Sequence, residues 1–260
     1  MKVKEVVAAL ERFAPLPLQE GYDNAGLQIG LTEADEVSGV LFCLDVTESI
    51  LHEAAGLRCN LVIAHHPLLF RGLKHITGSN QPERCAHLAI RSGIAVYAAH
   101  TNLDNAQGGV NWKIAECLGL ERIQFLLPSP SGNGGSGVIA ELPVPERPHQ
   151  FLSRVKKIFR VESLMHNIGP DHDIVRVALC GGAGDFLLDE AISQGADVFL
   201  TGEMGYHRYF GHENDIWIGI LGHYQSEQFT ISLMRDIVAA ACPGLPLYET
   251  GQSTNPIHYM

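Results

Sequence analysis

Short apolar runs alternate with amphipathic segments along the chain. Runs such as LVIA and VALC are apolar at every position, which is typical of strands that are buried on both faces. The segments between them carry apolar residues at helical spacing, with charged residues at the other positions. The pattern predicts strands at 39–46, 60–66, 94–100 and 175–180, and helices at 48–56, 82–93, 108–119 and 151–160.

This alternation predicts an α/β fold with mainly parallel sheets covered by helices, in which ligands bind beyond the carboxyl ends of the strands. The segment PSPSGNGGSG, residues 128–137, is the only linker-like stretch. After it the alternation of strand-like and helix-like segments resumes. We therefore predict a first lobe at 1–127, a linker at 128–137 and a second lobe at 138–260.

Histidines and acidic residues gather at three predicted strand ends. His65 and His66 stand before Pro67, which cannot donate to a strand ladder and so stops the strand with both imidazoles presented at its end. HTNLDN at 100–105 follows the next predicted strand, and GHYQSEQ at 222–228 supplies a third such segment. Because the carboxyl ends of parallel strands share one edge of a sheet, these segments predict a common site.

Imidazole nitrogens and carboxylate oxygens are the ligand types that hold zinc, iron or manganese. One helical turn brings His223 and Glu227 to the same face, and Asp104 approaches from another strand end. We therefore expect a metal site formed by His65, His66, Asp104, His223 and Glu227. Each residue also has a structural interpretation. A histidine at a strand end is often a hydrogen-bonded surface or core residue, an aspartate before a helix is commonly a cap, and a histidine with a glutamate four residues on is an ordinary helix pair.

Composition narrows the class of protein. The chain has 260 residues and a mass of 28.3 kDa, with 46% hydrophobic and 18% charged residues, which is typical of a soluble globular protein. A formal net charge of −11 argues against binding to a nucleic-acid backbone. No apolar run can span a membrane, and the amino-terminal segment is unlike a secretory signal. The six cysteines form no CxxC pair, which favours reduced, buried thiols. Because the amino-terminal segment does not resemble a secretory signal, we expect a cytoplasmic location.

Several longer motifs match one protein family. They are GYDNAGLQIG at 21–30, AHHPLLFRGLKHI at 64–76, AAHTNLDNAQGGVNWKIAECLGL at 98–120, VALCGGAGDFLLDEAISQGADVFLTGE at 177–203, GHYQSE at 222–227 and STNP at 253–256. Through these motifs, which span almost the whole chain, it resembles the NGG-interacting-factor-three-like family. Bacterial members of that family often carry the name GTP cyclohydrolase I type 2 homologue.

The resemblance implies two similar α/β lobes with a dinuclear metal site in the cleft between them, and a toroidal homohexamer. It gives the same five residues the role of ligands to two divalent ions, zinc, iron or manganese. Longer relatives carry an inserted domain where this chain has 128–137, so the chain resembles a short form. The resemblance implies the site without naming the substrate.

Five ligands are too few to fill the coordination shells of two ions, so water or substrate would complete them. Two ions about 3.5–4 Å apart polarise a phosphoryl or carbonyl oxygen and lower the pKa of bound water toward roughly 7. We expect Asp104 and Glu227 to bridge, because a carboxylate has two oxygens. This chemistry favours a metal-dependent hydrolase of a small phosphorylated or nucleotide-like substrate. The alternative is a non-catalytic metal-binding scaffold or regulatory ring.

The two halves of the chain also echo each other. LHEAAGLRCNLVIAHH at 51–66 aligns without gaps on LDEAISQGADVFLTGE at 188–203, with three identities in sixteen positions. In this alignment His66 falls on Glu203, and His207 follows four residues later. We therefore expect Glu203 and His207, as candidate catalytic residues, to orient a ligand or move a proton beside the metals. A shared βαβ pattern with no functional meaning is the alternative.

Two further segments allow two interpretations each. CGGAGD at 180–185 follows a predicted strand, where its backbone amides can cradle an anion or simply form a tight turn. Asp23 and Asn24 either line the pocket or belong to an ordinary turn beside glycine. We leave both segments outside the expected site.

Overall fold

The computed structural model describes residues 1–30, 36–130 and 132–260 and forms two compact units. The first unit comprises residues 1–106 and 230–256, and the second unit comprises 107–229 and 257–260. The chain thus leaves the first unit, builds the second and returns. Each unit has its own sheet.

The sheet of the first unit has five strands in the order β1-β4-β3-β2-β11. These strands are β1 (Gly26–Ile29), β2 (Val40–Cys43), β3 (Leu61–Ala64), β4 (Ala95–Ala98) and β11 (Leu247–Glu249). All run parallel except β1, which pairs antiparallel with β4 at one edge. The predicted mainly parallel sheet is therefore confirmed for this unit.

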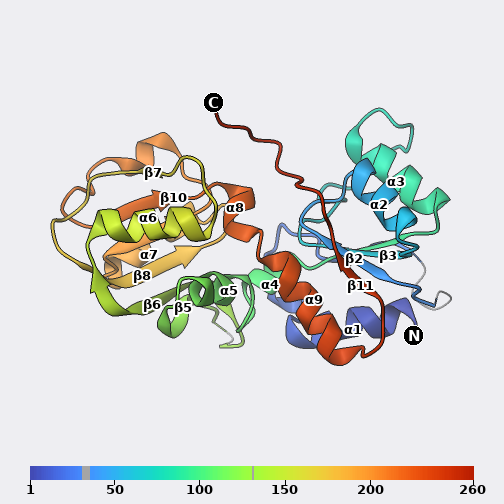
Figure 1. The fold of residues 1–260 in the computed structure, drawn as a ribbon, viewed down its shortest axis with the longest axis horizontal. Helices are drawn as coiled ribbons and strands as arrows, with labels where there is room; N and C mark the ends of the chain where they lie inside the picture. Colours follow the sequence, from blue (N-terminus) through green and yellow to red (C-terminus); the bar gives the residue numbers. More distant parts are fainter. Residues whose placement is uncertain (31–35, 131) are drawn as a thin grey trace. The chain divides into compact units, whose positions relative to one another are not determined.

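Helices cover both faces of this sheet. They are α1 (Val3–Phe13), α2 (Glu48–Gly56), α3 (Gln81–Arg91) and α9 (Thr230–Ala241), with the short α4 (Thr101–Asp104) after β4 and a 3-10 turn, η1 (Leu16–Leu18). Helices α2 and α3 lie together on one face, and α1 and α9 lie together on the other (Figure 1). Side-chain caps start two of these helices, since Thr47 accepts from the backbone of α2 and Asn80 from that of α3.

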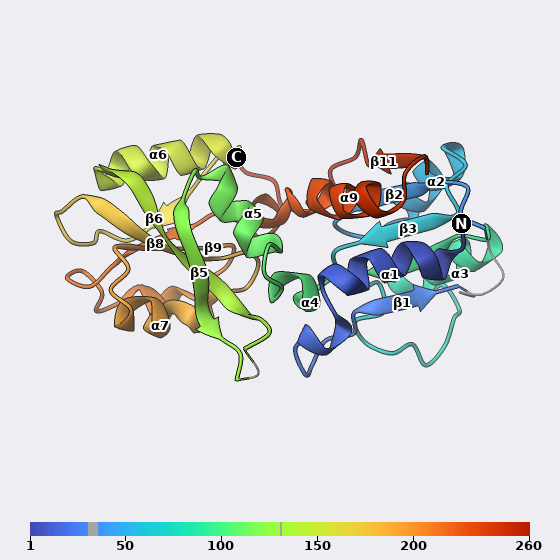
Figure 2. The ribbon, with the colours of Figure 1, turned by 90° about the horizontal axis from the view of Figure 1, so that it is seen from below.

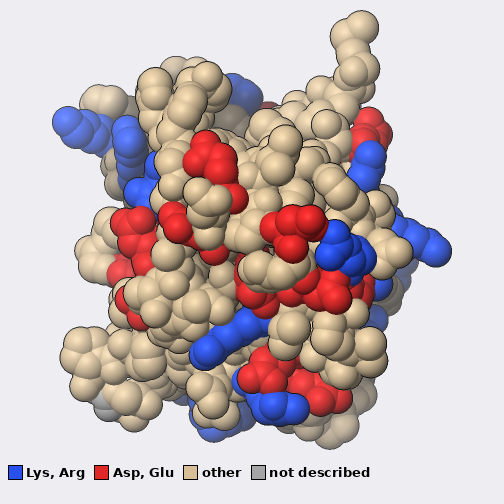
Figure 3. All heavy atoms as spheres, turned by 90° about the vertical axis from the view of Figure 1, so that its left-hand side faces the viewer, with Lys and Arg blue, Asp and Glu red and all other residues tan. Residues whose placement is uncertain are grey.

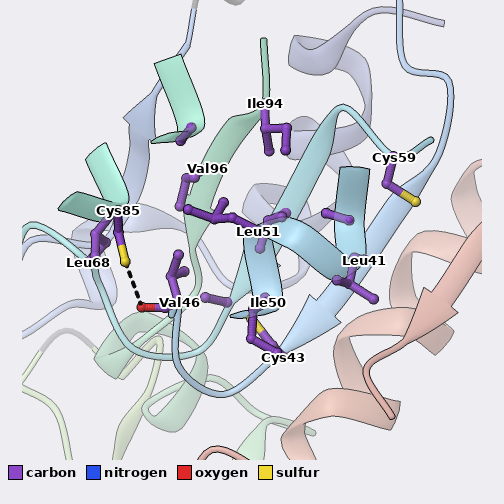
Figure 4. Packing of buried hydrophobic residues seen from close by; sticks show 14 residues of the cluster. Leu41, Cys43, Val46, Ile50, Leu51, Cys59, Leu68, Cys85, Ile94 and Val96 are labelled. Atoms are coloured by element: carbon purple, nitrogen blue, oxygen red, sulfur yellow. Dashed lines mark hydrogen bonds between the residues drawn. The ribbon is translucent and has the colours of Figure 1, made fainter. Parts of the chain in front are cut away.

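One core cluster of the first unit lies between the sheet and the pair α2 and α3 (Figure 4). Every residue of β2, β3 and β4 is buried, as expected for strands covered on both faces. Cys43 and Cys85 are part of this core, and the Cys85 thiol lies 3.8 Å from the carbonyl oxygen of Val46. None of the six cysteines forms a disulfide, and five of them are buried.

The second unit has a six-stranded sheet in the order β5-β6-β8-β9-β10-β7. Its strands are β5 (Glu121–Pro128), β6 (Gly135–Glu146), β7 (Met165–His166), β8 (Ile174–Cys180), β9 (Val198–Thr201) and β10 (Trp217–Ile220). Only β8, β9 and β10 run parallel, whereas the other three pairings are antiparallel. This sheet is mixed, so the expectation of mainly parallel sheets does not extend to it.

Helices cover the second sheet as well. They are α5 (Val110–Cys117), α6 (Pro148–Ile158), α7 (Leu188–Ser193) and α8 (His223–Glu227), with the 3-10 turns η2 (Asp185–Leu187) and η3 (Tyr206–Tyr209). Figure 2 shows α6 and α7 on opposite faces of this sheet. Phe199 and Ile218 are buried in the core cluster that includes residues of η2 and α7.

Residues 128–137 do not separate the two units. They join β5 to β6 within the second sheet, where Pro128 pairs with Gly135 and the Ser129 amide donates to the Gly134 carbonyl oxygen at 2.8 Å. Ser131, within the expected linker, lies outside the described residues. Glycine and proline suit a hairpin turn as well as a linker, and composition alone does not distinguish the two. The units divide near 106, 229 and 256 instead.

The internal repeat is visible in the strand register. The gapless alignment of 51–66 with 188–203 superimposes β3 on β9 residue for residue. In the first unit Leu61 pairs with Val40 on one side and with Ala95 on the other, both in parallel. In the second unit the corresponding strand β9 has the same arrangement between β8 and β10. An antiparallel strand then follows in each sheet, β1 beside β4 and β7 beside β10.

The exterior agrees with the acidic composition. The face shown in Figure 3 carries acidic side chains interspersed with basic ones, rather than one continuous basic area among its described residues. Within the part of the chain that the structure describes, no helix is both long enough and apolar enough to cross a membrane.

Candidate metal centre

Three histidines of the first unit meet just beyond the ends of β3 and β4. His65 and His66 follow β3 directly, and His100 comes two residues after β4. The ring centroid of His65 lies 4.9 Å from that of His66 and 5.3 Å from that of His100. One ring nitrogen of each histidine lies within 4.8 Å of the others. Small side-chain movements would bring all three around one ion, whose nitrogen ligands lie at about 2.0–2.1 Å.

His65 is fully buried, and its Nδ1 lies 2.8 Å from the carbonyl oxygen of Ala99. A carbonyl oxygen can only accept, so Nδ1 carries the proton and Nε2 carries the lone pair that a metal requires. The same Nε2 lies 3.7 Å from Oδ1 of Asp104 at the end of α4. The structure therefore brings together two of the expected ligands, His65 and Asp104.

Carboxylates orient the other two histidines of this group. Nδ1 of His66 lies 2.8 Å from Oδ1 of Asp45, and Nδ1 of His100 lies 2.7 Å from Oδ1 of Asp23. A carboxylate that accepts from Nδ1 fixes the ring orientation and makes Nε2 a better electron donor. This arrangement is the usual second layer of support around a histidine that binds a metal.

Both supporting carboxyl groups are held in the ionised form. Burial alone would raise the pKa of Asp23, but hydrogen bonds from His100 and Thr101 outweigh it and lower that pKa to about 2. Burial likewise acts against ionisation of Asp45, yet its pKa lies below the ordinary value because His66 donates a hydrogen bond to it. The histidines thus face fixed negative charge through Nδ1.

The second unit contributes a further histidine and carboxylate at the end of β10. Strand β10 ends at Ile220, Gly222 precedes α8, and that helix begins at His223 and ends at Glu227. Nε2 of His223 lies 3.2 Å from Oε2 of Glu227, so the expected pairing across one helical turn is confirmed. Nδ1 of His223 lies 2.8 Å from Oε1 of Glu203. Glu227 is buried, with only 4% of its surface exposed.

The donor set of His223 and Glu227 fits a divalent cation. If Nδ1 of His223 donates to Glu203, then Nε2 presents a lone pair to a carboxylate oxygen, and only a proton or a metal ion makes that contact attractive. Two ligand atoms bound at about 2.1 Å to one tetrahedral ion lie roughly 3.4 Å apart. The observed 3.2 Å is close to that separation.

Glycines make room for these side chains. Gly182 has φ +62°, and a Cβ at this position would lie 2.3 Å from Oε1 of Glu227. At Gly202 a Cβ would lie 3.0 Å from the Cα of His223. The amide of Gly182 donates to Ser226 Oγ at 3.0 Å. The CGGAGD segment is therefore a tight turn packed against α8, and the structure favours this interpretation over an anion cradle.

The two candidate catalytic residues, Glu203 and His207, have different surroundings in the structure. Oε1 of Glu203 lies 2.8 Å from Nδ1 of His223, and its role as a catalytic residue stays a prediction. His207 lies instead on the exposed turn η3, where its ring contacts Tyr206 and Phe210 at centroid distances of 5.2 and 6.3 Å. The spacing of four residues after Glu203 does not place His207 beside His223, because the chain turns into a 3-10 helix there.

Three supporting residues were not expected from the sequence. His100 lies at a predicted strand end but is not among the expected ligands, and the sequence allows Asp23 either to line the pocket or to belong to a turn. Asp45 was assigned to the interior of a predicted strand, whereas β2 ends at Cys43. A shorter strand prediction would have placed Asp45 at the same sheet edge as His66, which was the available signal.

Comparisons with known proteins show which family this chain resembles. A family model described as Duf34/NIF3 (NGG1p interacting factor 3) matches residues 1–256. A Lactococcus lactis protein named GTP cyclohydrolase 1 type 2 homolog is 35% identical over 267 residues, which covers 99% of each chain. NIF3-like protein 1 of Drosophila melanogaster is 31% identical over 233 residues, covering 87% of this chain and 78% of that protein. The crystal structure of a Bacillus cereus protein related to NIF3 superimposes with a TM-score of 0.88 at 25% identity, covering 100% and 99% of the two chains.

Proposed function

Because the chain belongs to the Duf34/NIF3 family, we propose that it binds two divalent metal ions and acts as a metal-dependent hydrolase. Histidine and carboxylate groups that can hold an ion are present in each unit. In the proposal they form one dinuclear centre between the lobes, with zinc, iron or manganese as the ions. The ligands are His65, His66, Asp104, His223 and Glu227.

One observation carries this proposal, namely the orientation of the histidines. His65, His66 and His223 each place Nδ1 within 2.8 Å of an oxygen acceptor, which leaves Nε2 of each ring as the electron donor. A histidine that serves only packing does not need its tautomer fixed in this way. Three ligands with the same tautomer support a role in binding cations.

Divalent ions at such a site supply Lewis acidity, which polarises a phosphoryl or carbonyl oxygen and acidifies water. The residues of the chain orient the metal ligands and keep the protons on the Nδ1 atoms of the histidine rings. Glu203 holds the proton on Nδ1 of His223, and Asp23 does the same for His100. We propose a small phosphorylated or nucleotide-like substrate, and the name of the Lactococcus lactis relative supports a nucleotide.

Metal analysis of the freshly purified full chain tests the proposal. We expect about two ions per chain, loss of both in Asp104→Ala if this carboxylate bridges, and strongly reduced content in Glu227→Gln. Glu213→Gln, which changes an exposed glutamate of the same unit, should keep the wild-type content. Hydrolysis of nucleotides and phosphoesters should require the ions and stop with a chelator. Wild-type metal content in both ligand variants would overturn the assignment.

A non-catalytic ring protein is the second candidate. Its support is a group of exposed aromatic side chains in the second unit, with Tyr206 71%, Phe210 59% and Phe186 55% exposed. Large exposed apolar side chains often mark contact surfaces. Family membership leads us to propose a homohexamer in either case, and light scattering should give about six times 28.3 kDa. A hexamer that holds metal but hydrolyses no substrate on a broad panel would favour the scaffold.

We also propose a cytoplasmic location. Six cysteines without a disulfide suit a compartment in which thiols stay reduced. Burial raises the pKa of the Cys59 and Cys85 thiols to about 11, so both remain protonated and unreactive at neutral pH.

A further inference from the structure

A pocket of about 790 Å³ opens in the second unit beside His223 and Glu203. Its walls come from segments far apart in the sequence, including β7, the end of β10 and the loop after β9. The C-terminal residues Ile257 and Tyr259 also line it. The pocket therefore lies beside one proposed metal ligand and is formed within one unit.

The pocket combines apolar walls with carboxylates. Met165, Met204 and Ile220 provide apolar surface, and Asp185 and Glu203 are the acidic side chains of the wall. Among the described residues that line it there is no lysine or arginine. Such a pocket disfavours an anionic group and favours a flat, neutral or cationic ring with N–H donors.

The C-terminal tail is packed against the start of α8. A Cβ at Gly222, which has φ +91°, would lie 3.3 Å from the hydroxyl oxygen of Tyr259. Glycine at 222 therefore allows both the left-handed turn before His223 and the close approach of the tail. Residues 257–260 belong to the second unit, although residues 230–256 belong to the first. The tail is thus a wall of the pocket.

We propose that this pocket binds the heterocyclic part of the ligand, a flat nucleobase-like ring with adjacent N–H donors. The donors face the carboxylates of Asp185 and Glu203, and Tyr259 provides an aromatic wall for the ring. Oε1 of Glu203 accepts from His223, which leaves Oε2 to accept from the ligand. This inference rests on the proposed function, because a phosphoryl group on such a ligand would be directed to the metals and away from the acidic wall.

Calorimetric titration of the full-length, metal-loaded protein with guanosine tests this inference. Guanosine carries adjacent N–H donors and no phosphate, whereas 1-methylguanosine lacks one of these donors. We expect guanosine to bind, and 1-methylguanosine to bind about tenfold more weakly. Asp185→Asn and Tyr259→Ala should each weaken guanosine binding by about tenfold or more, as expected for loss of a carboxylate acceptor or of an aromatic stacking surface.

Matched control variants distinguish a loss of guanosine binding in the pocket from a general effect on the fold or on metal binding. Asp189→Asn changes a neighbouring aspartate whose side chain is 83% exposed, and deletion of Met260 alone shortens the tail without removing Tyr259. Both should bind guanosine as the wild type does, whereas deletion of 257–260 should not. Equal guanosine affinity in all variants, or no binding to the wild type, would overturn the inference.

Metal content distinguishes this inference from the proposed function. The pocket variants should retain wild-type metal, because none of them removes a proposed ligand. If guanosine binding depends on Asp185 and Tyr259 in a protein that holds no metal, the proposed function fails and the pocket assignment stands. If the protein holds metal and hydrolyses a substrate but guanosine binding does not depend on Asp185 or Tyr259, the pocket assignment fails and the proposed function stands.

Discussion

Replacing Gly182 with alanine should displace the buried carboxylate of Glu227 while the fold persists. The added Cβ would lie 2.3 Å from Oε1 of Glu227. Carbon and oxygen atoms in close contact lie about 3.3 Å apart, so the carboxylate must move by roughly 1 Å. Glu227 is 4% exposed, and it cannot swing freely into solvent.

The magnitude follows from two costs. Alanine in the left-handed region that Gly182 occupies costs about 1 kcal/mol. Forcing the Glu227 side chain away from its rotamer costs about another 0.5–1.5 kcal/mol. We therefore expect the free energy of unfolding to fall by about 2 kcal/mol. Metal binding should suffer more, because metal–ligand distances tolerate deviations of only about 0.2 Å.

Gly195→Ala is the matched control. Gly195 has φ +69°, and a Cβ there would meet no heavy atom within 4 Å, so this variant bears the backbone cost alone. Urea unfolding followed by circular dichroism measures stability, and elemental analysis measures metal per chain. Gly195→Ala should lose about 1 kcal/mol and keep its metal. Equal metal content in the two variants would refute the reasoning.

Three further predictions address other parts of the chain. Glu203→Gln should weaken metal affinity by about 10–100-fold, because Glu203 holds the imidazole of His223 in position. The control Glu213→Gln should keep the wild-type affinity, and equal zinc affinities of the two variants in a titration would contradict this prediction. Four hydrogen bonds from the turn before α3 lower the pKa of Glu83 from 4.5 to about 2, so its contribution to stability is present above about pH 4.5 and is lost as the pH falls toward 2. The difference in unfolding free energy between wild type and Glu83→Gln should shrink across that window, and a constant difference would be evidence against this origin. Phe199→Ala should lower the free energy of unfolding, measured by chemical denaturation, by about 3–5 kcal/mol because this ring is fully buried. Replacement of the exposed Phe186 by alanine should change it by less than about 0.5 kcal/mol. Similar losses in the two variants would show that burial is not the cause.

Local patterns in the sequence predict the helices and strands well, because apolar residues have a different spacing in a helix and in a strand. The apolar runs at 61–64 and 95–98 are strands, and the amphipathic segment at 110–117 is a helix. The repeat was predictable for the same reason, since helix and strand follow each other at equal spacing in 51–66 and 188–203. The paired histidines before Pro67 were recognisable because proline ends the strand.

Long-range pairing was beyond the reach of these patterns. Asp23 lies 77 residues before its partner His100, and no local period connects the two. The return of α9 and β11 to the first unit is likewise invisible in composition, because an edge strand of three residues carries little signal. The sequence predicts a linker at 128–137 for a related reason, since glycine and proline are common both in linkers and in hairpin turns.

The return of the chain to its first unit has a consequence during synthesis on the ribosome. Strand β11 pairs with β2 through Leu247 and Val40, so about 200 residues must be translated before the edge of β2 is closed. At about 5–20 residues per second this delay is roughly 10–40 s. The contiguous segment 107–229, which makes up nearly all of the second unit, emerges before β11 and can fold while the first unit still has an open strand edge. The first sheet is therefore completed only near the end of translation, and until then the edge of β2 is open to non-native strand pairing.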